Sequence, residues 1–287
     1  MTSELGDSTA VDLRPVPRID HVMVLLDAAT YDEIAASGFL TERFARVKRK
    51  DADSSIAGSY ATLGIAGQNT LVELFGSAMP GASPLAGGLV FSFEEPGSSS
   101  SARALLDASG EVEYHHQLVH RAMPDTDEKQ PWYHLISVNL GTGSPMLLFL
   151  NEVTPEYFGS IGARPAPDGA LRRRAYLDAV LGRPDDGTHL LRDISGITLL
   201  VGAERATRIS NALTALGYTR SGEVLTGPGL AIRLVPTDGP ERVAEVHLDL
   251  VPGRRAADTP AELRLGRSRL LIEHDDTARW IFDPASH

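Results

Sequence analysis

The chain repeats one order of predicted elements, and this repeat limits the folds that it can adopt. Apolar runs rich in β-branched residues, with one short helical pattern, predict a strand, a helix and three strands between residues 19 and 75. After a stretch rich in Gly, Pro and Ala at residues 76–86, the same order is predicted between residues 88 and 153. A single unit of this kind cannot bury its sheet face, so we expect residues 18–155 to form two paired βαβββ modules.

The expected boundaries follow from turn residues and from the length of each apolar run. The predicted strands and helices of the two modules are strands 19–26, 39–49, 59–65, 70–75, 88–93, 112–122, 132–140 and 146–153, with helices 28–38 and 98–108 and a polar loop at 48–55.

The rest of the chain divides into three further parts. Residues 1–17 are acidic and polar, and we expect them to form a flexible tail. Residues 156–191 are a predicted helical connector, with a basic helix at 171–181 that we expect on the outside of the fold. Residues 192–287 are predicted to be a third βαβββ-like module with a C-terminal extension, in which residues 204–216 form the clearest amphipathic helix.

The composition excludes several classes of protein. The net charge of −11 argues against partners such as nucleic acid or an anionic membrane surface, because both attract Lys and Arg. The chain has no cysteine, which excludes disulfides, thiolate-bound zinc, iron–sulfur clusters and a cysteine nucleophile. No apolar run approaches the length of about 18 residues that a membrane span needs, and the N-terminal residues lack the plan of a signal peptide. We therefore expect a cytoplasmic protein, and we leave open that the third module pairs two chains in a homodimer.

Two of the predicted core strands carry one ionisable side chain each. His21 stands near the start of the first strand, on the same face as Met23. Glu73 lies in the fourth strand and shares its face with Phe75. A buried carboxylate is unfavourable unless it is paired or coordinated, so our hypothesis is that the two residues face a shared cavity. Simpler explanations are an imidazole hydrogen-bonded to the backbone and a carboxylate paired with an arginine.

A βαβββ module with His in its first strand and Glu in its fourth resembles the vicinal oxygen chelate superfamily of glyoxalases and extradiol dioxygenases. A narrower resemblance, to an uncharacterised glyoxalase-like bacterial family, is carried by residues 19–40, 60–76, 131–133 and 151–158. The resemblance implies an α+β fold, in which tandem βαβββ modules form curved mixed sheets around a divalent metal ion.

The resemblance also implies the metal ligands, which in that superfamily come from the first and fourth strands of two modules. It assigns His21 and Glu73 in the first module and Glu152 in the fourth strand of the second. With no cysteine in the chain, the ion would be zinc, iron(II), manganese or nickel on imidazole and carboxylate ligands.

The first strand of the second module departs from the superfamily pattern. Residues 88–93 contain no His or Gln, so His116 or His134 is expected to supply the missing ligand. The alternatives are that His116 is a surface residue and that Glu152, at the end of its strand, is simply solvated.

The function that the resemblance implies is a metal-dependent glyoxalase-like enzyme of the isomerase, lyase or dioxygenase type. Its substrate would be a small oxygenated organic molecule, with Glu73 or Glu152 as a ligand and as the catalytic base. The alternative is a non-catalytic binding or resistance protein that holds a small molecule in the cavity between the modules.

Overall fold

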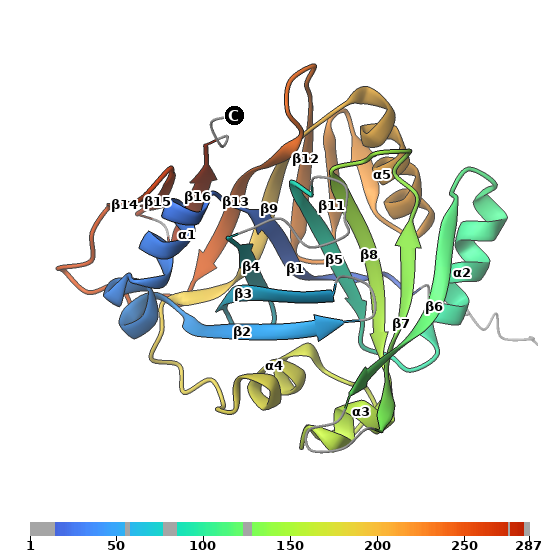
Figure 1. Cartoon of the computed structure of the whole chain (residues 1–287), viewed down its shortest axis with the longest axis horizontal. Helices are drawn as coiled ribbons and strands as arrows, with labels where there is room; N and C mark the ends of the chain where they lie inside the picture. Colours follow the sequence, from blue (N-terminus) through green and yellow to red (C-terminus); the bar gives the residue numbers. More distant parts are fainter. Residues whose placement is uncertain (1–14, 55–57, 77–84, 123–127, 275, 284–287) are drawn as a thin grey trace, which may run out of the picture.

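The computed structural model describes residues 15–54, 58–76, 85–122, 128–274 and 276–283. These residues form two eight-stranded mixed sheets that follow one another along the chain and share one hydrophobic core (Figure 1). Each sheet consists of two units joined through their first strands. The α+β class and the tandem βαβββ modules expected from the sequence are confirmed.

The N-terminal sheet contains the two modules that the sequence predicts. The first consists of β1 (Arg18–Leu25), α1 (Ala28–Ala35), a π-helical turn (Leu40–Phe44), β2 (Arg46–Ser54), β3 (Gly58–Ala66) and β4 (Leu71–Phe75). The second consists of β5 (Gly87–Phe93), α2 (Ser98–Ser109), β6 (Tyr114–Ala122), β7 (Lys129–Val138) and β8 (Met146–Val153). The strand order is β2-β3-β4-β1-β5-β8-β7-β6. Strand β1 runs parallel to β4 and β5 runs parallel to β8, whereas β1 and β5 are antiparallel.

The second strand of the first module differs from its prediction. The expected strand at 39–49 begins as a π-helical turn, and β2 continues through the expected polar loop at 48–55 as far as residue 54. The charged residues Arg46, Lys48 and Lys50 alternate on one face of β2 and made the strand look like a loop.

The C-terminal sheet repeats the strand order of the first, with one helix fewer. Its elements are β9 (Leu191–Val201), α5 (Ala203–Ala215), β10 (Thr219–Ser221), β11 (Val224–Gly227), β12 (Leu230–Pro236), β13 (Arg242–Leu250), β14 (Glu262–Leu265), β15 (Ser268–Ile272) and β16 (Thr277–Phe282). The order is β10-β11-β12-β9-β13-β16-β15-β14. The expected C-terminal extension is thus a fourth unit, β13 to β16. In the described residues of this unit no helix follows β13, and β16 runs antiparallel to β13.

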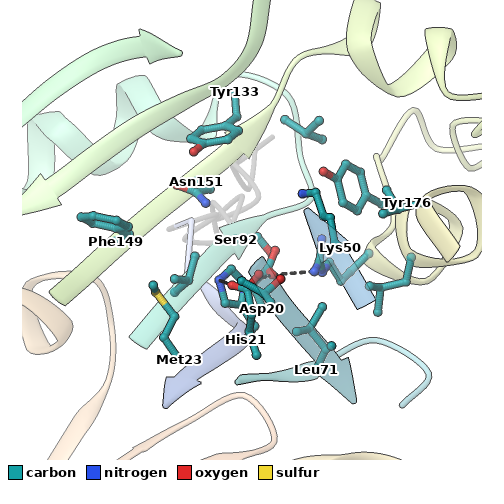
Figure 2. Close-up of a pocket in the computed structure, with 18 of the residues that line it drawn as sticks. Asp20, His21, Met23, Lys50, Leu71, Ser92, Tyr133, Phe149, Asn151 and Tyr176 are labelled. Atoms are coloured by element: carbon teal, nitrogen blue, oxygen red, sulfur yellow. Dashed lines mark hydrogen bonds and ion pairs between the residues drawn. The ribbon is translucent and has the colours of Figure 1, made fainter. Parts of the chain in front are cut away.

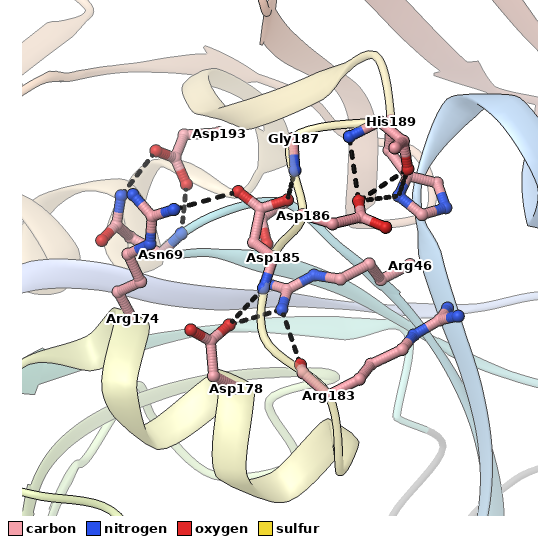
Figure 3. A network of polar contacts seen from close by, with 12 residues as sticks. Arg46, Asn69, Arg174, Asp178, Arg183, Asp185, Asp186, Gly187, His189 and Asp193 are labelled. Carbon is pink, nitrogen blue, oxygen red and sulfur yellow. Dashed lines mark hydrogen bonds and ion pairs between the residues drawn. The ribbon is translucent and has the colours of Figure 1, made fainter.

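The connector between the sheets is held against the first module. It contains α3 (Pro155–Ser160) and α4 (Arg173–Leu181). The side chain of Arg46 on β2 is only 2% exposed, and it donates to the Asp178 carboxylate of α4 at 2.5 Å and to the carbonyl of Gly67 at 2.6 Å (Figure 3). The ammonium group of Lys48 donates to the carbonyl of Val180, near the end of α4. These contacts fix α4 beside β2 (Figure 1).

The turn before β4 joins the two sheets. The backbone N–H groups of Asn69 and Thr70 donate to the Asp193 carboxylate at 2.7 and 3.0 Å. A Cβ atom on Gly67 would lie 2.3 Å from the carbonyl oxygen of Arg192, so only glycine allows this approach of the two backbones.

Some of the predicted segments lie outside the described residues. These are the tail up to residue 14 and the stretch 77–84 of the expected linker. Among the residues that the structure describes, no helix has the length and apolar character needed to cross a membrane.

Candidate functional site

One face of the N-terminal sheet borders a cavity of about 330 Å³ (Figure 2). Strands β1 to β5, β7 and β8 line this cavity, and residues 171–181 of the connector close it. The connector, which we expected on the outside of the fold, is therefore a wall of the cavity. Much of the lining is apolar and includes the small hydrophobic cluster of Met23, Phe75 and Val90.

A β-bulge in β1 brings two consecutive side chains to the cavity. Ile19 pairs with Phe91 and His21 pairs with Val90, so Asp20 stands opposite no residue of β5. In a regular strand, Asp20 and His21 would point to opposite faces, but the extra residue of a bulge turns a side chain to a new direction. Both residues line the cavity, and His21 Nδ1 lies 2.6 Å from Asp20 Oδ1.

Asp20 is a buried, ionised carboxylate. Burial by itself would raise its pKa, but the Arg173 guanidinium at 2.5 Å and the hydrogen bonds from His21 and Ser92 hold the pKa below its ordinary value of 3.8. An ionised carboxylate only accepts hydrogen bonds, so Nδ1 is the protonated nitrogen of His21 and donates to Asp20. The imidazole is thereby fixed in orientation, and Nε2 is the ring nitrogen that faces away from Asp20.

His21 and Glu73 meet on the cavity face of the sheet. Nε2 of His21 lies 3.4 Å from Oε2 of Glu73, and the two side chains are 18% and 19% exposed. The register of β1 and β4 explains this approach, because Glu73 stands opposite Met23, two residues beyond His21 on the same face. The structure therefore brings these two residues together as the sequence led us to expect. Their roles as ligand or catalyst stay predictions.

The second module presents polar but uncharged groups to the same cavity. Ser92 of β5 and Asn151 of β8 stand opposite each other in the parallel ladder, and both line the cavity. The Oδ1 atom of Asn151 is buried and has no hydrogen-bond partner among the described residues. Tyr176 of α4 accepts a hydrogen bond from Nε1 of Trp132 at 3.1 Å, and burial raises the pKa of its hydroxyl to about 12. Figure 2 places Asp20, His21 and Ser92 together, with Asn151 beyond them.

Glu152 points to the opposite face of the sheet. It is 6% exposed, and its two carboxylate oxygens accept from the backbone N–H groups of Gly97 and Ser99 at 2.7 and 2.5 Å. These groups belong to the N-terminus of α2, where four backbone donors lack partners within the helix. Glu152 therefore caps a helix, and the sequence-based expectation that it is a ligand or base at the cavity is not supported by its position.

His116 and His134 also lie on the helix side of the sheet. Their rings stack with centroids 5.7 Å apart, and neither residue lines the cavity. Burial, together with the nearby Arg103 of α2 and the His134 ring, lowers the pKa of His116. The structure does not bring these histidines to His21 and Glu73.

The donor set of the cavity falls short of a complete metal site. His21 and Glu73 are two strong donors from one module, whereas the second module offers the hydroxyl of Ser92 and the amide of Asn151. Within the described residues, no group of three or more His, Asp and Glu side chains could hold a metal ion. Resident transition metals usually have three or more protein ligands of these types. The residues present therefore do not fit the divalent ion that the resemblance implies.

Sequence reasoning missed several polar residues of the cavity, among them Asp20, Arg173 and Asn151. Asp20 reaches it only because of the bulge, and Arg173 only because α4 folds back over β2. The sequence did contain a signal that Asn151 faces the cavity. Leu148, Leu150 and Glu152 share the buried face of β8, so alternation places Asn151 on the opposite face.

The fold and the cavity define a class of protein. Paired βαβββ modules, with a cavity bordered by the first and fourth strands of each, form the vicinal oxygen chelate fold. The chain belongs to the family described as "Family of unknown function (DUF5829)", whose profile matches residues 19–282. No curated protein matches the chain in sequence.

Solved structures with a similar fold share little sequence with this chain. A fusion protein of a xylose isomerase-like TIM barrel and a 4-hydroxyphenylpyruvate dioxygenase is 12% identical, with a TM-score of 0.45, over 83% of this chain and 38% of that chain. An Mn(II)-bound glyoxalase from Novosphingobium aromaticivorans is 12% identical, with a TM-score of 0.43, over 80% and 64% of the two chains. A hypothetical protein from Staphylococcus aureus is 11% identical, with a TM-score of 0.48, over 87% and 96%. The chain thus spans less than two thirds of the first two structures, and these likenesses concern the fold alone.

Proposed function

We propose that the cavity is the active site of an enzyme that moves a proton on a small oxygenated organic molecule. The observation that carries this proposal is the contact of 3.4 Å between His21 Nε2 and Glu73 Oε2 in a cavity of about 330 Å³. Asp20 holds Nδ1 of the same imidazole, as a carboxylate does where histidine acts as a general base.

The chemistry follows from the two groups and from the lining. His21 Nε2 takes a proton from a carbon next to a carbonyl group, and the neighbouring Glu73 carboxylate stabilises the imidazolium that forms. Return of the proton to a different carbon gives an isomerase, and departure of a leaving group gives a lyase. The apolar wall accepts the carbon skeleton, and Asn151 binds an oxygen substituent through its side-chain amide.

The divalent ion expected from the resemblance has a separate test. His21 and Glu73 would be its two strong ligands, and water or the substrate would have to complete the set. Metal analysis of protein purified without added ions decides the matter. A stoichiometric ion that is lost in both His21→Ala and Glu73→Ala would restore the metal-dependent mechanism.

Proton transfer can be measured without knowledge of the natural substrate. We would incubate the protein in deuterium oxide with a panel of small ketones and hydroxy ketones and follow deuterium entry at the carbon beside the carbonyl by NMR. His21→Gln is expected to slow this exchange by about 10²- to 10⁴-fold, the usual contribution of a general base.

The matched control for this assay is His247→Gln in the C-terminal sheet. His247 also faces a carboxylate, with its Nε2 atom 3.5 Å from Oε2 of Glu245, but it lies outside the cavity. This variant should exchange deuterium at the wild-type rate. Equal exchange in wild type and His21→Gln would overturn the proposal.

A second candidate is a non-catalytic binder of small molecules, and the apolar cluster in the cavity wall favours it. Trp132 lines the cavity, whereas the other tryptophan, Trp280, is fully buried in the C-terminal sheet. Quenching of Trp132 by an aromatic ketone that undergoes no exchange would favour the binder over the enzyme.

A further inference from the structure

Strand β2 presents three cationic side chains on the face that borders the cavity, and two of them bind the connector. Arg46 donates to Asp178, and Lys48 donates to the carbonyl of Val180, so both hold α4 in place. Lys50, the third, lines the cavity and has no hydrogen-bond or ion-pair partner among the described residues.

The surroundings of Lys50 favour an uncharged amine. Its ammonium nitrogen lies 5.6 Å from the centroid of the Trp132 ring, a contact that by itself favours the charged form. The Arg121 guanidinium lies 4.8 Å from the same centroid, and its charge opposes that of the ammonium group. Burial is the largest cause that lowers the pKa of Lys50, followed by the charge of Arg121, and the charge of Glu73 only partly opposes them. Desolvation beside other cations is the environment that activates a lysine as a nucleophile.

We propose that the Lys50 amine condenses with the carbonyl group of a small aldehyde or ketone in the cavity, a step that rests on the proposed function of this site. The amine nitrogen bonds to the carbonyl carbon, and the carbonyl oxygen leaves as water with the two amine hydrogens. The product is an imine, and no atom changes its oxidation state. Hydrolysis by one water molecule restores the amine and the carbonyl compound.

Imine formation would serve the proposed acid–base pair that β1 and β4 present to the same cavity. A protonated imine withdraws electrons from the adjacent carbon more strongly than a carbonyl does, so the C–H bond on that carbon becomes more acidic. His21 Nε2, next to Glu73, is the base that the cavity offers for this proton. The imine at Lys50 would thereby supply the electron withdrawal that a divalent ion could provide, at a cavity whose described residues include only two strong ligands for such an ion. The inference narrows the substrate class to aldehydes and ketones with a hydrogen on the adjacent carbon.

The chain provides its own controls for a test. It contains only three lysines, and Lys48 and Lys129 are exposed whereas Lys50 is half-buried. We would treat the full-length protein with substoichiometric propanal and sodium cyanoborohydride at pH 7, and measure the modified fraction of each lysine by peptide mass mapping. Lys50 is expected to be trapped several-fold faster than the other two, because a lowered pKa leaves a larger fraction of its amine uncharged at pH 7. Trapping of Lys50 at the rate of Lys48 or Lys129, or more slowly, would overturn the inference.

Two variants separate this inference from the proposed function. His21→Gln should lose deuterium exchange and keep the selective trapping of Lys50. Lys50→Arg keeps the positive charge and removes the nucleophile, so it should abolish adduct formation at this position and slow exchange by at least about tenfold. If exchange depends on His21 but Lys50 is not trapped, only the present inference fails. If Lys50 is trapped but no exchange depends on His21, only the proposed function fails.

Discussion

The two sheets of the molecule have the same backbone plan at the first strand of each and different side chains there. Asp20 stands unpaired between β1 and β5, and Ser195 stands unpaired at the matching shift between β9 and β13. The next residue is His21 in the first sheet and Gly196 in the second. The bulge therefore occurs in both sheets, and in the N-terminal sheet its extra residue is the carboxylate that holds the His21 imidazole.

The fourth strand of the module shows the same contrast. Glu73 stands opposite Met23 in the first sheet, and Arg233 stands opposite Thr198 in the second. Glu73 is half-buried in the cavity, whereas Arg233 is exposed. The same backbone plan thus carries an imidazole and a carboxylate where the connector helix closes a cavity, and an exposed cation at the matching strand position of the second sheet.

The largest effect that tests this comparison is expected for Asp20→Asn. The substitution removes the carboxylate from a buried pair and leaves Arg173, whose side chain is 12% exposed, without its counter-charge. Breaking a buried ion pair by removing one partner destabilises a protein by about 3–5 kcal/mol. Urea unfolding would measure this loss. Ser195→Ala, at the matching bulge, should change the stability by less than about 0.5 kcal/mol.

The contribution of Asp20 also has a defined dependence on pH. Its pKa is lower in the folded chain than its ordinary value of 3.8, so it binds a proton less readily in the folded state. Its stabilisation is therefore complete above that ordinary value and is lost as the pH falls through the lower folded pKa. The difference in stability between wild type and Asp20→Asn should shrink below about pH 4. A difference that is constant from pH 7 to pH 3 would show that Asp20 does not act through its charge.

A second comparison concerns the helices of the two N-terminal modules. The N-terminus of α1 is capped locally by Asp27, which accepts from the backbone N–H of Thr30 at 2.9 Å. The corresponding cap of α2 is Gly97, which has no side chain, and Glu152 supplies the acceptor from β8. Glu152, which the sequence suggests as a possible ligand, therefore caps α2 in place of a side chain at Gly97.

Substitution of Glu152 should therefore affect stability and leave the cavity unchanged. Glu152→Gln is expected to destabilise the protein by about 1–3 kcal/mol, because a buried acceptor of two charge-assisted hydrogen bonds is lost. Thermal unfolding would measure the loss, with Asp27→Ala as the matched variant on α1. Deuterium exchange by the folded Glu152→Gln protein should equal that of wild type. A large loss of exchange would return Glu152 to the catalytic site that the sequence suggested.

The sequence predicts those parts of the site that depend on strand order and fails where distant segments meet. The convergence of His21 and Glu73 follows from the parallel pairing of the first and fourth strands, which the order of the elements implies. The bulge at Asp20 depends on the pairing with β5, and the position of Arg173 depends on how α4 folds over β2. Neither leaves a local pattern in the sequence. The role of Glu152 as a helix cap was not predicted, because its partner, the N-terminus of α2, lies more than fifty residues away in the sequence.

The smallest expected effect is on the pH dependence of stability. It concerns His116, which lies on the helix side of the sheet in the second module. Burial and nearby cations lower its pKa below 6.5, so the unfolded chain binds a proton more readily and stability falls as the pH drops below that value. His116→Gln should make this fall in stability between pH 7 and pH 5 slightly shallower. Burial also lowers the pKa of His189, so this residue should still make stability depend on pH in the His116→Gln variant. Urea unfolding at several pH values would measure both slopes, and a steeper fall in His116→Gln than in wild type would contradict the assigned environment of this histidine.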